Sequence, residues 1–138
     1  MTNHVDTIRT YFDLCERKDY RAVAERLIGD GYTYIDHTTD VVANTPEQLE
    51  AALVEDLQWS EQKFGIKQAI ETTDGALVVL ATLTQTLTGE WHSIKGAGQQ
   101  VRWEFCDIFR FDGEGRIVGE ELYGDGLSIM RQLGAVSV

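Results

Sequence analysis

The stretch Val101–Phe111, which reads V-R-W-E-F-C-D-I-F-R-F, decides how the rest of the sequence is interpreted. Side chains on a strand alternate between two faces. One face of this strand would therefore carry an aspartate among apolar side chains: Val101, Trp103, Phe105, Asp107, Phe109 and Phe111. A carboxylate in such surroundings must be paired, hydrogen-bonded or protonated. The role of Asp107 is therefore the central question that the sequence raises.

Length and composition predict a single domain, residues 1–138, that is large enough to bury a core. The net charge of -11 argues against nucleic acid or an anionic membrane as partner, because both repel an acidic surface. No apolar run is long enough to cross a membrane, and the first residues lack the order of a signal peptide. Cys15 and Cys106 stand far apart without companion ligands. They indicate free thiols in a reducing cytoplasm and neither a metal site nor a disulfide.

The first half of the chain predicts helices. Apolar residues at helical spacing predict a helix over residues 5–15 with Tyr11 on its buried face. Asp19 should cap a second, shorter helix. Thr45-Pro46-Glu47-Gln48 is typical of a helix start, with a threonine cap, proline at the first position and glutamine for a capping box. This third helix should end near Trp59.

Residues with an alternating pattern predict strands. The first is Tyr32–Thr38, with Tyr34 and Asp36 on one side. Three more should follow the third helix, over residues 64–70, 76–87 and 101–111, and residues 116–123 should return as a hairpin after the turn Asp112-Gly113-Glu114-Gly115. Gly89–Gly98 is expected to be a loop, and Asp125 to cap a last short helix. The order of helices and strands predicts an α+β fold with an antiparallel sheet wrapped over helices.

Four segments together resemble a known family: Y-F-D-L-C-E-R-K-D-Y, Y-T-Y-I-D-H, T-P-E-Q-L-E-A and C-D-I-F-R-F-D-G-E-G-R-I-V. They are similar to the SnoaL-like polyketide cyclases and the ketosteroid isomerases, both of the nuclear-transport-factor-2-like superfamily. The resemblance implies a cone-shaped fold, in which a strongly bent, mostly antiparallel sheet wraps over the N-terminal helices around an apolar cavity. It also implies a homodimer, and neither a metal nor an organic cofactor.

The isomerase pattern, carried over by residue, implies that Asp36 is the general base, Tyr11 the oxyanion-binding tyrosine and Asp107 a protonated hydrogen-bond donor. The cyclase pattern makes Asp107 the principal acid/base and suggests His92 as the assisting histidine. Because Asp36 stands at a strand end beside polar residues, we expect it to stay ionised while burial keeps Asp107 protonated. The aromatic side chains expected to bind the ligand are Tyr34, Trp59, Trp91, Trp103, Phe105 and Phe109.

Each of these residues also has a structural interpretation. Asp107 could accept hydrogen bonds from buried hydroxyls such as those of Tyr32 or Tyr34, and Asp36 could simply hold a turn. Tyr11 could be a core tyrosine with a satisfied hydroxyl.

Two further positions stay open. His92 in its loop could be a rim histidine without a chemical role. Glu120 and Glu121 are adjacent on a strand, so they face opposite ways, and the sequence does not decide which one points inward.

The leading hypothesis is a cofactor-free isomerase or cyclase that binds a small apolar or polycyclic carbonyl compound. One alternative is a non-catalytic ligand-binding or association domain with the same cavity, because fold similarity alone does not establish catalysis. A second alternative is an epoxide hydrolase or dehydratase. The epoxide chemistry would need an arginine between two aspartates inside the pocket, whereas Arg110 alternates onto the face opposite Asp107.

Overall fold

The computed structural model describes residues 3–137 and contains four helices in this part of the chain. They are α1 (His4–Glu16), α2 (Tyr20–Arg26), α3 (Pro46–Leu57) and α4 (Gly126–Gln132). The predicted helix caps are confirmed. The side chains of Asp19, Thr45 and Asp125 accept hydrogen bonds from backbone N–H groups in the first turns of α2, α3 and α4. None of the described helices is long and apolar enough to cross a membrane.

Six strands form one sheet, in the spatial order β2-β1-β8-β7-β4-β3. Their bounds are β1 (Ile28–Asp36), β2 (Val41–Ala43), β3 (Ser60–Glu71), β4 (Leu77–Leu87), β7 (Gln100–Phe111) and β8 (Ile117–Gly124). All neighbours are antiparallel except β1 and β8, which are parallel. The predicted loop at 89–98 contains a small additional hairpin, formed by β5 (Glu90–Trp91) and β6 (Ile94–Lys95).

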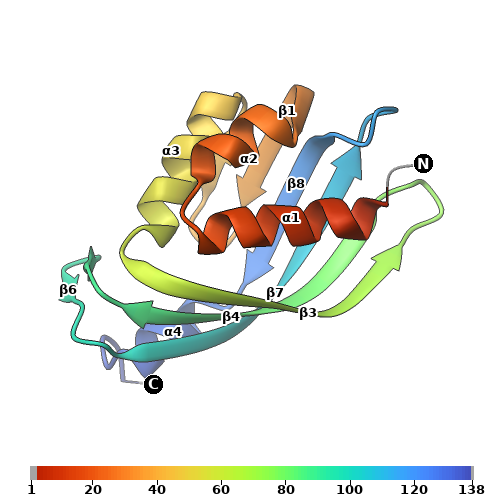
Figure 1. Cartoon of the computed structure of the whole chain (residues 1–138). Coiled ribbons are helices and arrows are strands. Elements are labelled where there is room, and N and C mark those ends of the chain that lie inside the picture. Colours follow the sequence, from red (N-terminus) through yellow and green to blue (C-terminus); the bar gives the residue numbers. More distant parts are fainter. Residues whose placement is uncertain (1–2, 138) are drawn as a thin grey trace.

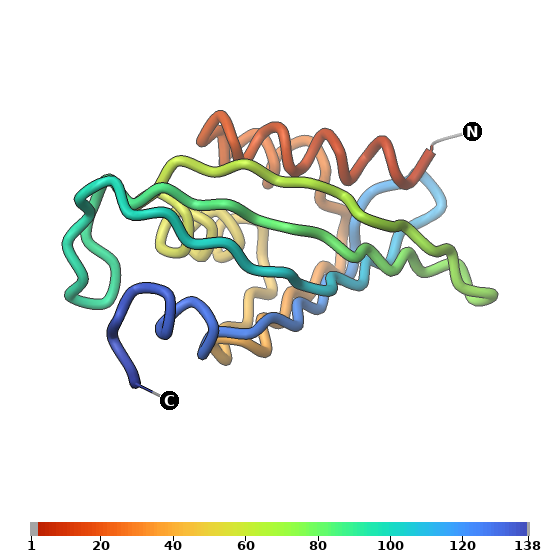
Figure 2. Tube along the Cα trace, turned by 90° about the horizontal axis from the view of Figure 1, so that it is seen from below, coloured from red at the N-terminus to blue at the C-terminus, as the bar shows by residue number. Residues whose placement is uncertain are grey.

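The sheet is long and bent, and α1, α2 and α3 lie over its inner face (Figure 1). The tube view shows how β3, β4 and β7 run side by side beneath α1 and how the chain from β8 into α4 turns back near the β5–β6 hairpin (Figure 2). The predicted α+β class, with a curved and mostly antiparallel sheet over N-terminal helices, is confirmed.

Strand β7 alternates as the sequence predicts. Val101, Phe105, Asp107 and Phe109 are buried on the inner face, whereas Arg102 is exposed on the outer face. Its antiparallel pairing with β8 changes register once, between Arg110 and Phe111. After this irregularity, Phe109 pairs with Glu120 and Asp107 with Leu122.

The core lies between the inner face of the sheet and the helices. Ile8, Leu14 and Cys15 of α1 are buried there together with Leu49 of α3 and Phe109 of β7. Because burial of one such aliphatic or aromatic side chain stabilises a fold by about 1.5–3 kcal/mol, this packing fixes where α1 and α3 sit. Both cysteines are free thiols, Cys15 buried and Cys106 half-buried on the outer face.

Candidate functional site

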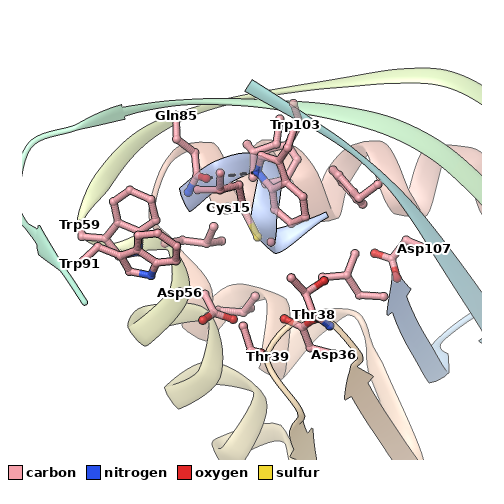
Figure 3. A pocket seen from close by; sticks show the side chains of 18 of the residues that line it. Cys15, Asp36, Thr38, Thr39, Asp56, Trp59, Gln85, Trp91, Trp103 and Asp107 are labelled. Carbon is pink, nitrogen blue, oxygen red and sulfur yellow. Dashed lines mark hydrogen bonds between the residues drawn. The ribbon is translucent and has the colours of Figure 1, made fainter. Parts of the chain in front are cut away.

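A cavity of about 390 Å³ lies between the inner face of the sheet and helices α1 and α3. The β5–β6 hairpin contributes Trp91 and His92 to its rim, and α4 contributes Ile129 and Met130. Figure 3 shows side chains from these separate parts of the chain pointing into one space. The walls are mainly apolar and aromatic, which is typical of small-molecule sites.

The structure brings together most residues that the sequence singled out. The four candidates for chemistry, Tyr11, Asp36, His92 and Asp107, all line this cavity. So do five of the six predicted aromatic binding residues: Tyr34, Trp59, Trp91, Trp103 and Phe105.

The sequence-based prediction that Phe109 binds the ligand needs correction, because Phe109 does not line the cavity. Its side chain is fully buried in the core, where the ring packs edge-on against that of Tyr11 with centroids 6.0 Å apart. The alternation of β7 placed Phe109 on the correct face, but α1 covers that part of the face and leaves no space for a ligand.

Asp107 lies next to a second buried acid, Glu120 of β8, and we call these two residues the inner carboxyl pair. Their exposed fractions are 2% and 4%. The two carboxyl groups hydrogen-bond to each other. Glu120 Oε1 also accepts hydrogen bonds from the hydroxyls of Tyr11 (2.9 Å) and Tyr32 (3.2 Å). The inward-facing glutamate, which the sequence left open, is therefore Glu120.

The different environments of Asp107 and Glu120 favour the proton on one of the two carboxyl groups. Burial, followed by the charge of Glu120, raises the pKa of Asp107 well above its usual value. Burial also raises the pKa of Glu120, but the hydrogen bonds from Asp107, Tyr11 and Tyr32 offset part of that effect. Two close carboxyl groups in an apolar site cannot both ionise cheaply. Asp107 therefore holds the proton and donates it to an ionised Glu120.

This arrangement changes the interpretation of Tyr11. Its hydroxyl is buried at the cavity wall, and its only O–H donates to Glu120. Burial and the charge of Glu120 raise the pKa of this hydroxyl, so it stays protonated. Tyr11 consequently supports the inner carboxyl pair, and its donor is already used when the cavity is empty.

Asp36, the last residue of β1, is buried at a different part of the wall. Its Oδ1 accepts a hydrogen bond of 2.8 Å from the backbone N–H of Thr38, and its Oδ2 accepts a long one of 3.5 Å from the hydroxyl of Tyr34. The first bond is the turn-holding contact that the sequence suggested as an alternative. Because Asp36 also lines the cavity, the turn and the site use the same side chain.

Asp56 is a functional candidate that the sequence interpretation missed. It lies on α3 and lines the cavity near Asp36. Burial, followed by the charges of Asp36 and Glu55, raises the pKa of Asp56 to about 7. Asp56 follows Ala52 by four positions and Leu53 by three, so helical spacing alone places it on the buried face of α3.

Three tryptophans shape the cavity. The rings of Trp59 and Trp91 are stacked with centroids 4.8 Å apart and an angle of 21° between their planes. Trp103 is fixed on the other side, because its indole N–H donates to Oε1 of Gln85 at 3.2 Å. Gln85 in turn donates to the hydroxyl of Ser60 at 3.1 Å. This buried chain of hydrogen bonds holds one wall in place.

His92 lies at the rim. It is exposed, its backbone has a φ of 47°, and its ring meets that of Trp91 edge-on at 4.5 Å. Among the lining residues that the structure describes, none is lysine or arginine. Arg110 lies on the outer face, where it pairs with Asp74 at 3.2 Å. Within residues 3–137, no group of three or more His, Cys, Asp or Glu side chains is arranged to hold a metal ion.

Comparison with protein families identifies one match. The model of the SnoaL-like polyketide cyclases matches residues 5–133, which is nearly the whole chain. This match confirms the resemblance drawn from the sequence segments. A comparison with curated protein sequences found no match.

Solved structures share the fold at low sequence identity. A protein from Jannaschia sp. CCS1, assigned as a SnoaL-like polyketide cyclase, has a TM-score of 0.82 at 20% identity over 97% of this chain and 93% of its own. A protein from Catenulispora acidiphila with a ketosteroid isomerase-like fold, in complex with trimethylamine, has a TM-score of 0.77 at 17% identity, covering 93% and 92%. An LEH-like epoxide hydrolase from M. tuberculosis has a TM-score of 0.71 at 15% identity, covering 94% of this chain and 84% of its own.

Proposed function

The chain belongs to the SnoaL-like polyketide cyclase family, and from this premise we propose that it is a cofactor-independent acid/base enzyme that isomerises or cyclises a small apolar carbonyl compound. One observation carries the proposal: Asp36 and Asp107, from strands far apart in the sequence, line the same mainly apolar cavity. Reactions next to a carbonyl need a base for the acidic C–H proton and a donor for the oxygen that gains negative charge. Two carboxyl groups in different environments provide both.

Asp107 is the donor in this proposal. Burial raises the pKa of its carboxyl, so that it carries a proton at neutral pH. When a substrate binds, the Asp107 O–H would turn from Glu120 to the substrate carbonyl oxygen, while the hydroxyls of Tyr11 and Tyr32 continue to stabilise the charge of Glu120.

Asp36 is the base. The backbone N–H of Thr38 and the hydroxyl of Tyr34 orient its carboxyl group, while the cavity remains accessible to it. It would take a proton from the carbon next to the carbonyl, and the electron pair left behind would move towards the oxygen that faces Asp107. Return of the proton from Asp36 to another carbon completes an isomerisation. In a ring closure, the carbanion attacks a second carbonyl carbon, and the alkoxide that forms takes the proton from Asp36.

Glu120, Tyr11 and Tyr32 act through Asp107 rather than on the substrate. The two tyrosine hydroxyls hold the charge on Glu120, and Glu120 keeps Asp107 in place and protonated. Tyr11 is therefore a positioning residue in this proposal. The epoxide hydrolase alternative gains no support, because Arg110 pairs with Asp74 on the outer face.

Hydrogen–deuterium exchange tests the proposal. With 2-tetralone as an enolisable probe in D₂O, NMR should show that the protein accelerates exchange at the carbon next to the carbonyl. Asp36→Asn should reduce the rate at least about 100-fold, the usual contribution of a general base, while Asp107→Asn should retain part of it. Asp13→Asn, an exposed carboxylate on α1, is the control for loss of one charge.

Two outcomes would reject the proposal. A wild-type exchange rate equal to that of buffer, with the ketone bound, would leave a ligand-binding domain. An exchange rate unchanged in Asp36→Asn would remove Asp36 as base. The homodimer and the cytoplasmic location remain predictions, and size-exclusion chromatography tests the first.

A further inference from the structure

The cavity is unbalanced in charge. Four acids line it, namely Asp36, Asp56, Asp107 and Glu120, and no lysine or arginine is found among its described lining residues. Among the described lining residues, His92 is the one whose side chain can become cationic, and it is exposed at the rim. Buried carboxylates in proteins are normally paired with cations or neutralised. The inner carboxyl pair shares a proton, but Asp36 and Asp56 have no cationic partner among residues 3–137.

Asp56 lacks the contacts that stabilise an ionised carboxyl. The charges that act on it are those of Asp36, from β1, and of Glu55, from its own helix, and both are negative. Together with burial, they raise the pKa of Asp56 to about 7. A bound cation at this position would relieve the repulsion between Asp36 and Asp56 and would favour the ionised form of Asp56.

An aromatic surface lies beside this acidic pair. In Figure 3, Asp56 has the stacked rings of Trp59 and Trp91 on one side and the carboxyl of Asp36 on the other. Tryptophan faces attract ammonium groups more strongly than those of other aromatic residues, and the attraction grows when water is excluded. Trp59 is 5% exposed, so little of its ring is in contact with bulk solvent.

The aromatic wall beside the acidic pair supplies an independent observation. The indole N–H of Trp59 is buried and has no hydrogen-bond acceptor among the described residues, although Trp59 lines the cavity. A ligand that reaches Asp107 with a polar group and the acidic pair with another would contact both ends of the cavity. The volume of about 390 Å³ accommodates a compound of one or two rings.

We propose that the ligand of this cavity carries an ammonium group, held between the Trp59–Trp91 rings and the carboxyls of Asp36 and Asp56. This inference rests on the proposed function in one respect: the substrate is then an apolar carbonyl compound that also bears a basic or quaternary nitrogen. The nitrogen would lie at the Asp56 end and the carbonyl at the Asp107 end. Specificity would come from the acidic end, because a neutral ligand leaves the two aspartates unpaired.

Isothermal titration calorimetry with two isosteric probes tests the inference. Phenyltrimethylammonium and tert-butylbenzene have the same shape and differ by one positive charge. We expect the cation to bind at least about tenfold more tightly than the hydrocarbon, as contacts to aromatic faces and carboxylates in a partly dry site imply. Asp56→Asn should remove most of this preference and leave the affinity for tert-butylbenzene within about twofold, because the replacement keeps the shape of the side chain.

Two further variants separate the sources of the effect. Trp91→Leu should lower the affinity for the cation more than the affinity for the hydrocarbon. Asp13→Asn, a substitution at an exposed position on α1, should change neither affinity. Equal or tighter binding of tert-butylbenzene, or an unchanged preference in Asp56→Asn, would overturn the inference.

The binding assay needs no turnover, so its failure is distinct from failure of the proposed function. Exchange of 2-tetralone without a preference for the cation would leave the enzyme proposal intact and remove this one. The reverse result would leave a binding site for cationic ligands.

Discussion

Replacement of Asp56 by asparagine should stabilise the protein at high pH. The usual pKa of an aspartate, 3.8, is raised to about 7 at Asp56, so the folded state binds more protons than the unfolded state between these values. Ionisation of Asp56 therefore costs the folded protein stability as the pH rises through this window. Asp56→Asn keeps the shape of the side chain and removes this cost.

The size of the effect follows from the shift. The difference between 3.8 and about 7 is about 3 pH units, and each unit corresponds to about 1.36 kcal/mol. This gives an upper value of about 4 kcal/mol. Water at the cavity mouth reaches the partly exposed carboxyl and screens it, so we expect the variant to gain about 2–4 kcal/mol relative to wild type between pH 4 and pH 8.5.

Urea denaturation followed by circular dichroism, for wild type and Asp56→Asn at about pH 4 and about pH 8.5, measures this difference. Asp13→Asn, exposed on α1, controls for the removal of one charge from an acidic protein. The inner carboxyl pair also titrates, but it is present in all three proteins and cancels. A difference in the free energy of unfolding between Asp56→Asn and wild type that is the same at both pH values would refute the argument.

Three other substitutions, one of them with a control variant, probe side-chain packing, a buried hydrogen bond and a helix cap. Gly124→Ala should cost about 1–3 kcal/mol and change the near-ultraviolet dichroism, because a Cβ there would overlap the indole ring of Trp103; an unaltered spectrum would show that the ring is not fixed. Tyr32→Phe should cost about 1–3 kcal/mol at neutral pH in urea denaturation, because it removes a hydroxyl donor from the inner carboxyl pair. Tyr20→Phe is its control and should be near neutral, since the buried Tyr20 hydroxyl has no partner among the described residues; equal losses would contradict the assignment. Thr45→Ala should cost about 1 kcal/mol in the same assay by removing the cap of α3, and no loss would mean that another contact holds the helix start.

The sequence correctly predicted that Asp107 is buried, because this depends only on the alternation of side chains along one strand. Alternation along β7 put its carboxyl on the buried face, and the caps at Asp19, Thr45 and Asp125 set the starts of three helices. Phe109 shows the limit of alternation, which gives the face of a residue but not what covers it. In the fold, α1 fills the space above Phe109 and leaves Phe105 at the cavity.

Glu120 could not be predicted, for a physical reason. If the pairing of β7 with β8 continued regularly from Phe111 and Ile117 at the turn, Glu121 would lie opposite Asp107. The register change between Arg110 and Phe111 instead pairs Phe109 with Glu120 and turns Glu121 outward. Such an irregularity depends on packing across the whole sheet.

Asp56 is a different case. Helical spacing on α3 was enough to place Asp56 on the buried face. The sequence interpretation assigned that face from its apolar residues alone and therefore left out an acidic one.

The register change between β7 and β8 also bears on how relatives of this protein could diverge. Side chains on a strand change faces when the pairing slips by one residue. If the strands kept every residue but paired without this irregularity, Glu121 would face the cavity and Glu120 would turn outward, without any substitution near Asp107. A change in strand pairing remote from the carboxyl groups would thus change which glutamate lines the cavity, and a sequence alignment, which records no bulge, would assign the wrong glutamate to the site.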